Sequence, residues 1–139
     1  MRLALLLSVA LLAVAGCDSA DDVPLTCDNI SLSIETEELA PGTGTAVASR
    51  TSTVQLDYVG TLEDGSEFDS GTDVVFGLAR TVSGFSEGVA GMRLGGQRRI
   101  TIPPYRGYGT QVRRNGEGET VIPACSTLIF EVTLDDILG

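Results

Sequence analysis

Alternation of apolar and polar residues along the chain predicts four β-strands. In Thr53–Leu62, for example, Val54, Leu56 and Tyr58 fall on one face of an extended chain, because successive side chains of a strand point to opposite sides. The same pattern marks three further segments, which are Asn29–Glu35, Gln97–Ile102 and Thr127–Ile137. The pattern therefore predicts a fold that is rich in half-buried strands.

One short helix is predicted over Gly84–Met92. Ser83 is its candidate N-cap and Gly95-Gly96 is expected to end it, and one helical face carries Phe85, Val89 and Met92. So short a helix is marginal alone and has to be held by packing. Four or five strands with one helix indicate an α+β fold, in which an antiparallel sheet is folded over that helix.

Glycine, proline and charged residues mark the connections between these elements. Proline and glycine place a loop at Glu37–Thr45, and Glu63–Ser66 has the composition of a tight turn. Tyr105–Glu119 is rich in glycine and charge and is expected to be a long loop. This loop, which carries Arg113-Arg114 and Glu117, either selects a binding partner or is only solvated.

Residues 1–16 have the features of an export signal. Arg2 precedes the apolar run Leu3–Val14, which is too short for a membrane span of about 20 residues. The residues before Cys17 resemble a bacterial lipoprotein box, in which the cysteine is acylated and becomes the mature N-terminus. A plain signal peptide cut near Ala15 or Ala20 is the alternative. We expect a lipoprotein signal at 1–16, an acidic tether at 17–26 and one domain at 27–139.

The composition excludes several kinds of chemistry. The chain has 139 residues and no histidine, and its nine basic residues are all arginine. It therefore has no Ser-His-Asp triad, no histidine-ligated zinc and no lysine for a Schiff base. A formal net charge of −10 argues against a nucleic-acid partner, because such binding needs a basic face. No metal and no cofactor are expected.

The three cysteines divide between two roles. If Cys17 is lipidated, Cys27 and Cys125 are left in the exported domain. Two cysteines in an oxidising compartment indicate a disulfide, and two free thiols are the alternative. No Cys-x-x-Cys occurs in the sequence, so a redox-active pair or a zinc site is not expected.

Several motifs in a fixed order resemble the FKBP family of peptidyl-prolyl isomerases. The resemblance covers roughly residues 29–138, which is most of the chain after the signal. The matching motifs, in chain order, are Tyr58–Gly65, Phe68–Ser70, Val82–Met92, Ile102–Pro104, Tyr108–Gly109, Ile122–Pro123 and Thr127–Val132.

The resemblance implies a twisted antiparallel sheet wrapped around one short helix, with a pocket between them for the proline ring of a substrate. The residues that it implies for catalysis are Tyr58, Phe68, Asp69 and Tyr108. Those that it implies for substrate binding are Phe76, Val82, Phe85 and Phe130. Plain core packing is the alternative for each aromatic residue, and a surface turn carboxylate is the alternative for Asp69. A Cys27–Cys125 bond would join the N-terminal strand to the start of the last strand.

The sequence departs from the family pattern at a few positions. Phe85 stands where the family usually has a pocket-floor tryptophan, which keeps an apolar floor but loses the indole N–H. The segment between Phe76 and Phe85 also looks about two residues shorter than usual. Ala124 replaces a common second proline. These differences leave substrate affinity and turnover open.

The chemistry that the resemblance implies needs no nucleophile. Rotation about a peptide bond faces a barrier of about 18–20 kcal/mol, and an apolar pocket that prefers the twisted amide lowers it. The expected function is isomerisation of Xaa-Pro bonds in exported or envelope proteins, which assists their folding. A proline-binding chaperone or a scaffold lipoprotein with little turnover is the alternative.

The expected partners follow from the same resemblance. They are proline-containing polypeptides, macrolide inhibitors, and a membrane reached through the lipid on Cys17, where two or more acyl chains give stable anchoring. The expected location is the bacterial cell envelope, facing the periplasm or the exterior. The chain is expected to be a monomer and to bind no nucleic acid.

Overall fold

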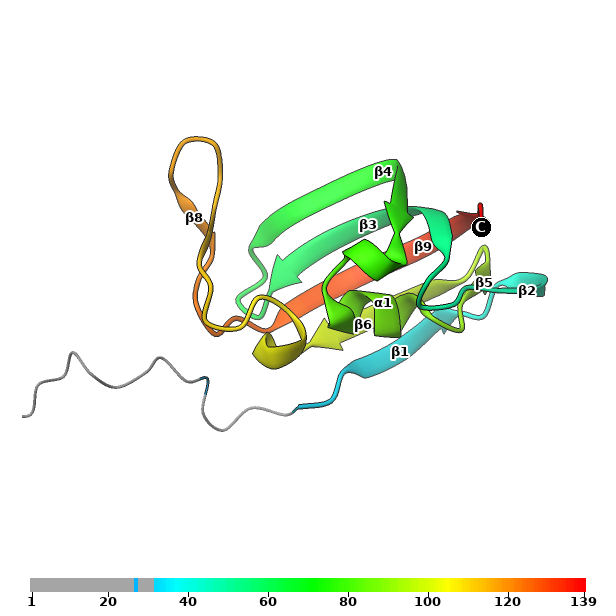
Figure 1. Ribbon diagram of the computed structural model, residues 1–139, viewed down its shortest axis with the longest axis horizontal. Coiled ribbons are helices and arrows are strands. Elements are labelled where there is room, and N and C mark those ends of the chain that lie inside the picture. Colours follow the sequence, from blue (N-terminus) through cyan, green and yellow to red (C-terminus); the bar gives the residue numbers. More distant parts are fainter. Residues whose placement is uncertain (1–26, 28–31) are drawn as a thin grey trace, which may run out of the picture.

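The computed structural model of the chain describes residue 27 and residues 32–139. The expected signal, Cys17 and the acidic tether lie outside the described residues. The main elements are β1 (Glu35–Ala40), β3 (Thr53–Leu62), β4 (Glu67–Gly77), α1 (Ser83–Val89), β6 (Gln97–Ile102) and β9 (Leu128–Ile137). The five strands form one antiparallel sheet in the order β1-β6-β9-β3-β4, with α1 against one face (Figure 1). The predicted α+β class is confirmed.

Smaller elements connect the parts of this sheet. Two short antiparallel ribbons pair β2 (Thr43–Val47) with β5 (Arg93–Leu94), and β7 (Arg113–Arg114) with β8 (Thr120–Ile122). The second ribbon projects beyond one end of the sheet (Figure 1). Single 3₁₀ turns η1 and η2 occupy Leu78–Arg80 and Pro104–Arg106. No helix in the described part of the chain is long and apolar enough to cross a membrane.

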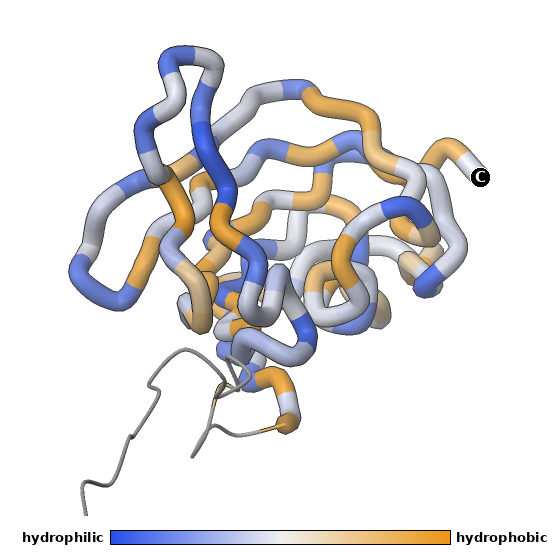
Figure 2. The backbone as a smooth tube through the Cα atoms, turned by 60° about the vertical axis from the view of Figure 1, so that its left-hand side comes forward, coloured by the Kyte–Doolittle hydropathy of each residue, from blue (hydrophilic) through white to orange (hydrophobic). Residues whose placement is uncertain are grey.

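The core is built from the alternating residues of the central strands. The predicted bounds of β3 and β6 are confirmed, and β9 begins one residue later than predicted. Apolar and polar residues alternate along these strands (Figure 2), so one face packs against α1 while the other faces solvent. The buried strand residues are Val54, Leu56, Tyr58, Ile100, Ile102, Leu128, Phe130, Val132 and Leu134.

The helix is held against β6 by close packing. Phe85, Val89 and Met92 are buried, which confirms the predicted apolar stripe. A Cβ on Gly84 or Gly88 would lie inside van der Waals contact with the isoleucines of β6, so glycine is what permits this close approach. The helix is shorter than predicted, because it ends at Val89 and not near Gly95-Gly96.

The helix termini differ from the sequence expectation in their capping. Ser83 is the first helical residue and the N-cap is Val82, which makes no side-chain cap. At the other end, the Arg98 guanidinium of β6 donates to the carbonyls of Gly88 at 2.8 Å and Ala90 at 3.0 Å. A cation that bonds the last carbonyls stabilises a helix C-terminus.

The N-terminal strand was predicted in the wrong place. The expected strand at 29–35 is not a strand over residues 32–34, and residues 28–31 lie outside the description. The expected loop Glu37–Thr45 instead contains most of β1 and the start of β2. Apolar alternation is missing here because β1 is an edge strand with both faces largely exposed. Charge pairs with β6 support it, including one of 2.7 Å between Glu37 and Arg99.

A disulfide joins Cys27 to Cys125, with a sequence separation of 98 residues and a Cα–Cα distance of 5.3 Å. Cys125 was expected at the start of the last strand. It lies instead in the turn before β9. Its N–H donates to the carbonyl of Gly109 at 2.8 Å. The disulfide therefore ties the region before β1 to the loop that carries Tyr108.

Candidate active site

A cavity of about 500 Å³ lies between the sheet and α1. We call it the aromatic cavity. All eight site residues predicted from the sequence line it, and they come from β3, β4, α1, β9 and the loops before α1 and after β6. These residues are Tyr58, Phe68, Asp69, Phe76, Val82, Phe85, Tyr108 and Phe130. The structure thus brings the predicted set together, whereas their roles in binding and catalysis stay predictions.

Five aromatic rings form one connected wall of this cavity. Phe85 of α1 contacts the Phe130 ring at a centroid distance of 5.0 Å and the Phe76 ring at 5.9 Å. The Tyr58 ring is edge-on to Phe76 at 5.5 Å, and Phe68 meets Phe130 at 5.4 Å with ring planes at 90°. Edge-to-face pairs of this kind contribute about 0.5–1.5 kcal/mol each beyond simple burial.

The backbone of β3 makes room for this wall. Gly60 pairs with Phe130 across the β3–β9 register. A Cβ at Gly60 would lie 2.6 Å from the Phe68 ring and 3.0 Å from the Phe130 ring. Only glycine therefore lets these two rings meet above the strand, which gives a physical reason for the glycine in the Tyr58–Gly65 motif.

Tyr58 and Asp69 form a polar contact at the edge of the wall. The Tyr58 hydroxyl donates to Asp69 Oδ2 at 2.8 Å, and the Ser70 N–H donates to Asp69 Oδ1 at 2.9 Å. Burial, followed by the hydrogen bond to the carboxylate, raises the pKa of Tyr58 to about 12, because both disfavour the phenolate. Tyr58 is therefore a neutral donor that orients Asp69.

Two hydrogen-bond donors of the cavity lining have no acceptor among the described residues. Val82 is extended with ψ of 146° just before α1, and no described residue accepts a hydrogen bond from its N–H. The Tyr108 hydroxyl is likewise without a partner among the described side chains, while its ring lies 4.9 Å from the Arg113 guanidinium carbon. Both donors are free for the backbone carbonyls of a bound peptide.

The sequence analysis missed four residues of the lining. These are Val75, Gly77, Arg80 and Thr81, which lie at the end of β4 and in η1. No strand was predicted over β4, because it is a largely exposed edge strand and lacks the alternation of the central strands. Arg80 carried no signal that would separate it from the other arginines of the chain.

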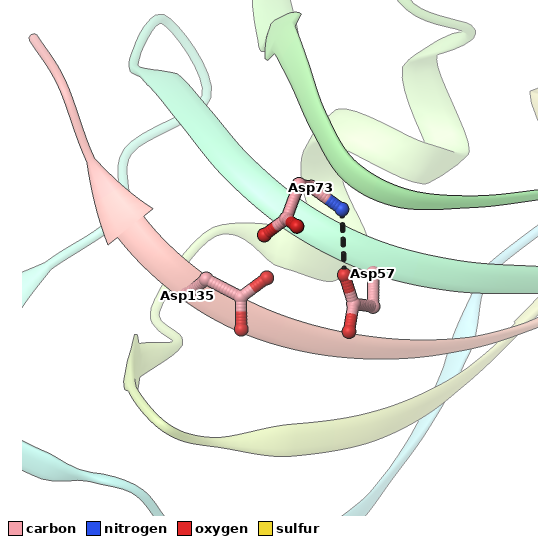
Figure 3. Close-up of side chains that lie close together, drawn as sticks. All are labelled: Asp57, Asp73 and Asp135. Atoms are coloured by element: carbon pink, nitrogen blue, oxygen red, sulfur yellow. Dashed lines mark hydrogen bonds between the residues drawn. The ribbon is translucent and has the colours of Figure 1, made fainter.

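A separate acidic cluster lies away from the aromatic cavity. Asp57, Asp73 and Asp135 offer carboxylate oxygens within 4.8 Å of one another (Figure 3). The Asp73 N–H donates to Asp57 Oδ1 at 2.7 Å. Burial and the neighbouring Asp57 carboxylate raise the pKa of Asp135. This cluster is on the solvent face of the sheet and takes no part in the site described above.

The solvent face also carries a shallower hollow of about 360 Å³. We call it the outer hollow. Its lining includes Leu39, Asp57, Val59, Gln97 and Glu131, which occupy the outward positions of the sheet strands. Polar and charged groups make up much of this lining, so it lacks the continuous aromatic wall that an apolar ring would need.

The aromatic cavity suits binding and distortion of a ligand rather than covalent chemistry. Its walls are apolar rings, and its one carboxylate already accepts two hydrogen bonds. The lining contains no serine and no cysteine. Such a site can hold a small apolar ring, exclude water from it and fix adjacent carbonyls through the two donors at the mouth.

Comparison with known proteins agrees with this geometry. The family model of FKBP-type peptidyl-prolyl cis-trans isomerases matches residues 44–135. An FK506-binding protein of Neisseria meningitidis serogroup C is 42% identical over 87 residues, covering 58% of this chain and 75% of that protein. FK506-binding protein 2 of Yarrowia lipolytica is 40% identical over 107 residues, covering 73% and 71%.

Solved structures show the same fold. A peptidyl-prolyl cis-trans isomerase of Pseudomonas syringae superposes with a TM-score of 0.67 at 31% identity and covers 79% of each chain. FkpA from Escherichia coli gives a TM-score of 0.64 at 32% identity, covering 79% of this chain and 52% of its own. With the family model spanning most of the domain, these matches show that the chain belongs to the FKBP-type peptidyl-prolyl cis-trans isomerases.

Proposed function

We propose that the aromatic cavity is the site at which this isomerase binds and rotates Xaa-Pro bonds, and that its substrates are exported or envelope proteins. The observation that carries the proposal is the convergence of all eight sequence-predicted residues on one cavity with a five-ring wall. The volume and apolar character of the cavity suit a proline ring with its flanking peptide.

The proposed mechanism is preferential binding of the twisted amide. The rings of Phe76, Phe85 and Phe130 hold the proline ring and exclude water, which disfavours the more polar planar amide. The Val82 N–H and the Tyr108 hydroxyl hold the carbonyls on either side. Each tenfold acceleration requires about 1.4 kcal/mol of preference for the twisted form over the planar form.

Asp69 acts electrostatically in this proposal. Its carboxylate is fixed by the Tyr58 hydroxyl and the Ser70 N–H and lies at the edge of the aromatic wall. As an exposed anion held in one orientation, it favours the twisted amide, whose carbonyl carbon carries more positive charge once the nitrogen lone pair is no longer shared with it. Removing the carboxylate therefore lowers the rate more than it lowers peptide affinity.

Macrolide binding is proposed for the same cavity. Relatives of this chain carry the name FK506-binding protein, and an apolar ring system with hydrogen-bonding carbonyls would use the same rings and donors as a proline peptide. FK506 is accordingly expected to compete with peptide substrates. Inhibition that leaves peptide binding unchanged would contradict a shared site.

The envelope location rests on the proposed lipid anchor at Cys17. Expression of the full chain in a bacterium, followed by mass spectrometry of the N-terminal peptide, tests it, with Cys17→Ala as the control. The expected result is a chain that begins at an acylated Cys17 and partitions with membranes. An unmodified chain cut near Ala15 or Ala20 would show a plain signal peptide instead.

Magnetisation-transfer NMR on a short Xaa-Pro peptide tests the catalytic proposal. The purified chain is expected to speed cis–trans exchange, and FK506 is expected to abolish the effect. Binding of the peptide without faster exchange would indicate a proline-binding chaperone. Neither binding nor exchange would leave a scaffold lipoprotein as the remaining function.

A further inference from the structure

Two arginines at the aromatic cavity differ from the others that the structure describes. Arg50, Arg93, Arg98, Arg99, Arg106 and Arg114 each bond a carboxylate or a backbone carbonyl. In the described part of the chain, only the guanidinium groups of Arg80 and Arg113 have no hydrogen bond or ion pair with the protein. Both belong to the aromatic cavity, one in its lining and one against a lining ring.

Arg80 is held rigidly at the cavity mouth. It ends η1, whose first residue Leu78 is fully buried and donates to the Ser52 carbonyl at 2.9 Å. The next residue closes the turn, because the Thr81 hydroxyl donates to the Leu78 carbonyl at 2.8 Å. Arg80 Cδ would lie 4.0 Å from a Cβ built on Gly77, so the side chain passes near that residue. Its guanidinium has no acidic partner among the described residues, and Arg80 lines the cavity together with Val82.

Arg113 is held at the opposite side of the mouth by the β7–β8 ribbon. Its guanidinium carbon lies 4.9 Å from the centroid of the Tyr108 ring, which is within the range of a cation–π contact. Its neighbour Arg114 is used structurally, since it bonds the Gly118 carbonyl at 3.1 Å and Thr120 Oγ1 at 3.0 Å. The ribbon thus uses Arg114 internally and leaves Arg113 in contact with a ring of the cavity lining.

No carboxylate in the described part of the chain forms an ion pair with the guanidinium group of Arg80 or Arg113. The only carboxylate in the lining is Asp69, and both of its oxygens accept hydrogen bonds from Tyr58 and Ser70. Glu119, on the ribbon, accepts from Asn115 at 2.9 Å. Two unpaired cations in a chain of formal net charge −10 form a local feature that the overall charge does not explain.

We propose that Arg80 and Arg113 make the aromatic cavity select proline segments that carry an acidic side chain next to the proline. The inference rests on the proposed function of this cavity. A bound proline places its neighbouring residues at the mouth, where an aspartate or glutamate meets a free guanidinium. Arginine suits this role, because it stays charged and offers a planar set of donors to a carboxylate.

The size of the effect follows from the exposure of the pair. Ion pairs between solvent-exposed groups contribute modestly, so we expect a gain of between about twofold and fivefold in kcat/KM for an acidic over an isosteric neutral neighbour. Salt screens such pairs, and the gain should shrink at about 1 M ionic strength, where the Debye length is about 3 Å. Peptides with neutral neighbours should show no comparable salt dependence.

The test compares matched peptides with the purified full chain. Isomerisation is measured by NMR exchange for Glu-Pro against Gln-Pro and for Pro-Glu against Pro-Gln, and the readout is the ratio within each pair. The variants are Arg80→Gln with Arg113→Gln, and Arg80→Lys with Arg113→Lys. Arg93→Gln is the control, because it removes an arginine charge from β5, outside the aromatic cavity.

The expected result is a ratio above about two for at least one pair, which falls towards unity in the double glutamine variant. The double lysine variant and Arg93→Gln should keep the preference, and higher salt should reduce it. Ratios at or below unity for both pairs, or a preference that survives the double glutamine variant, would overturn the proposal. If the wild-type chain does not accelerate isomerisation of the Gln-Pro and Pro-Gln peptides at all, the result contradicts the proposed function of the cavity, on which this selectivity rests.

Discussion

Replacing Tyr58 with phenylalanine is expected to change how the stability of the domain depends on pH. The substitution keeps the ring in the aromatic wall and removes only the hydroxyl that donates to Asp69 Oδ2 at 2.8 Å. Because the acceptor is ionised, the loss should lower the free energy of unfolding by about 1–2 kcal/mol near neutral pH.

The sign of the alkaline effect follows from the pKa of Tyr58. The ordinary value is 10.0, and burial together with the Asp69 hydrogen bond raises the pKa in the folded protein to about 12. Above about pH 10 the unfolded chain therefore loses this proton while the folded chain keeps it, so stability falls as pH rises. The loss is about 1 kcal/mol by pH 11 and approaches about 3 kcal/mol above pH 12. The Tyr58 hydroxyl lines an open cavity and bonds an exposed carboxylate, so solvent screening makes these figures upper values.

This chain is well suited to the measurement. It has no lysine, so the groups that usually dominate titration between about pH 9 and pH 11 are absent. In the Tyr58→Phe variant the contribution of this group disappears, and the remaining tyrosines contribute equally to both proteins. The stability difference between wild type and variant should therefore stay constant up to about pH 9 and then shrink up to about pH 11.

Urea unfolding followed by far-ultraviolet circular dichroism provides the free energies across this range. Tyr105→Phe is the matched control, because Tyr105 is 52% exposed and lies outside the aromatic cavity. The control should follow the wild-type profile at every pH. A wild-type to Tyr58→Phe difference that is the same at pH 8 and pH 11 would refute the reasoning.

Two further predictions concern stability. Replacing both Cys27 and Cys125 with alanine opens a loop closed over 98 residues and should lower the free energy of unfolding by up to about 4–5 kcal/mol. An unchanged urea midpoint under non-reducing conditions would contradict a structural disulfide. In α1, Gly88→Ala would place a Cβ 2.8 Å from Ile100 Cδ1. This close contact should lower the free energy of unfolding of the domain by about 1–3 kcal/mol, as measured by thermal unfolding. Gly116→Ala, in open space, is the control and should leave stability unchanged.

The sequence pattern predicted the parts of the fold that are buried on one face. The central strands β3, β6 and β9 alternate because one side of each faces α1 and the other faces water. The edge strands β1 and β4 lack that constraint. Both are stabilised by ladder hydrogen bonds, and β1 also by charge pairs with β6. Such support depends on tertiary partners, which no local pattern reveals.

The candidate site was more predictable than the fold around it. Seven of the eight residues were found through motifs whose order is fixed, and Phe76 lies between two of these motifs. The structure brings all eight together because β3, β4, α1 and β9 converge on one cavity. Arg113 was noted only together with Arg114 and Glu117 in the loop Tyr105–Glu119, and Arg80 was not singled out, because an arginine without a partner looks the same in a sequence as one that caps a helix. Their distinction is visible only once the other arginines in the described part of the chain are seen to be paired.

The measurement that most directly tests the role of the aromatic cavity compares isomerase activity in two single variants. Phe68→Ala removes a ring that meets Phe130 at 5.4 Å in the cavity wall, whereas Val59→Ala trims an exposed residue of the outer hollow on the other face of the sheet. If catalysis takes place in the aromatic cavity, kcat/KM should fall by about tenfold or more in Phe68→Ala, which corresponds to a loss of at least about 1.4 kcal/mol of transition-state stabilisation. The same quantity should change little in Val59→Ala. Wild-type activity in a folded Phe68→Ala variant, or a loss confined to Val59→Ala, would contradict it.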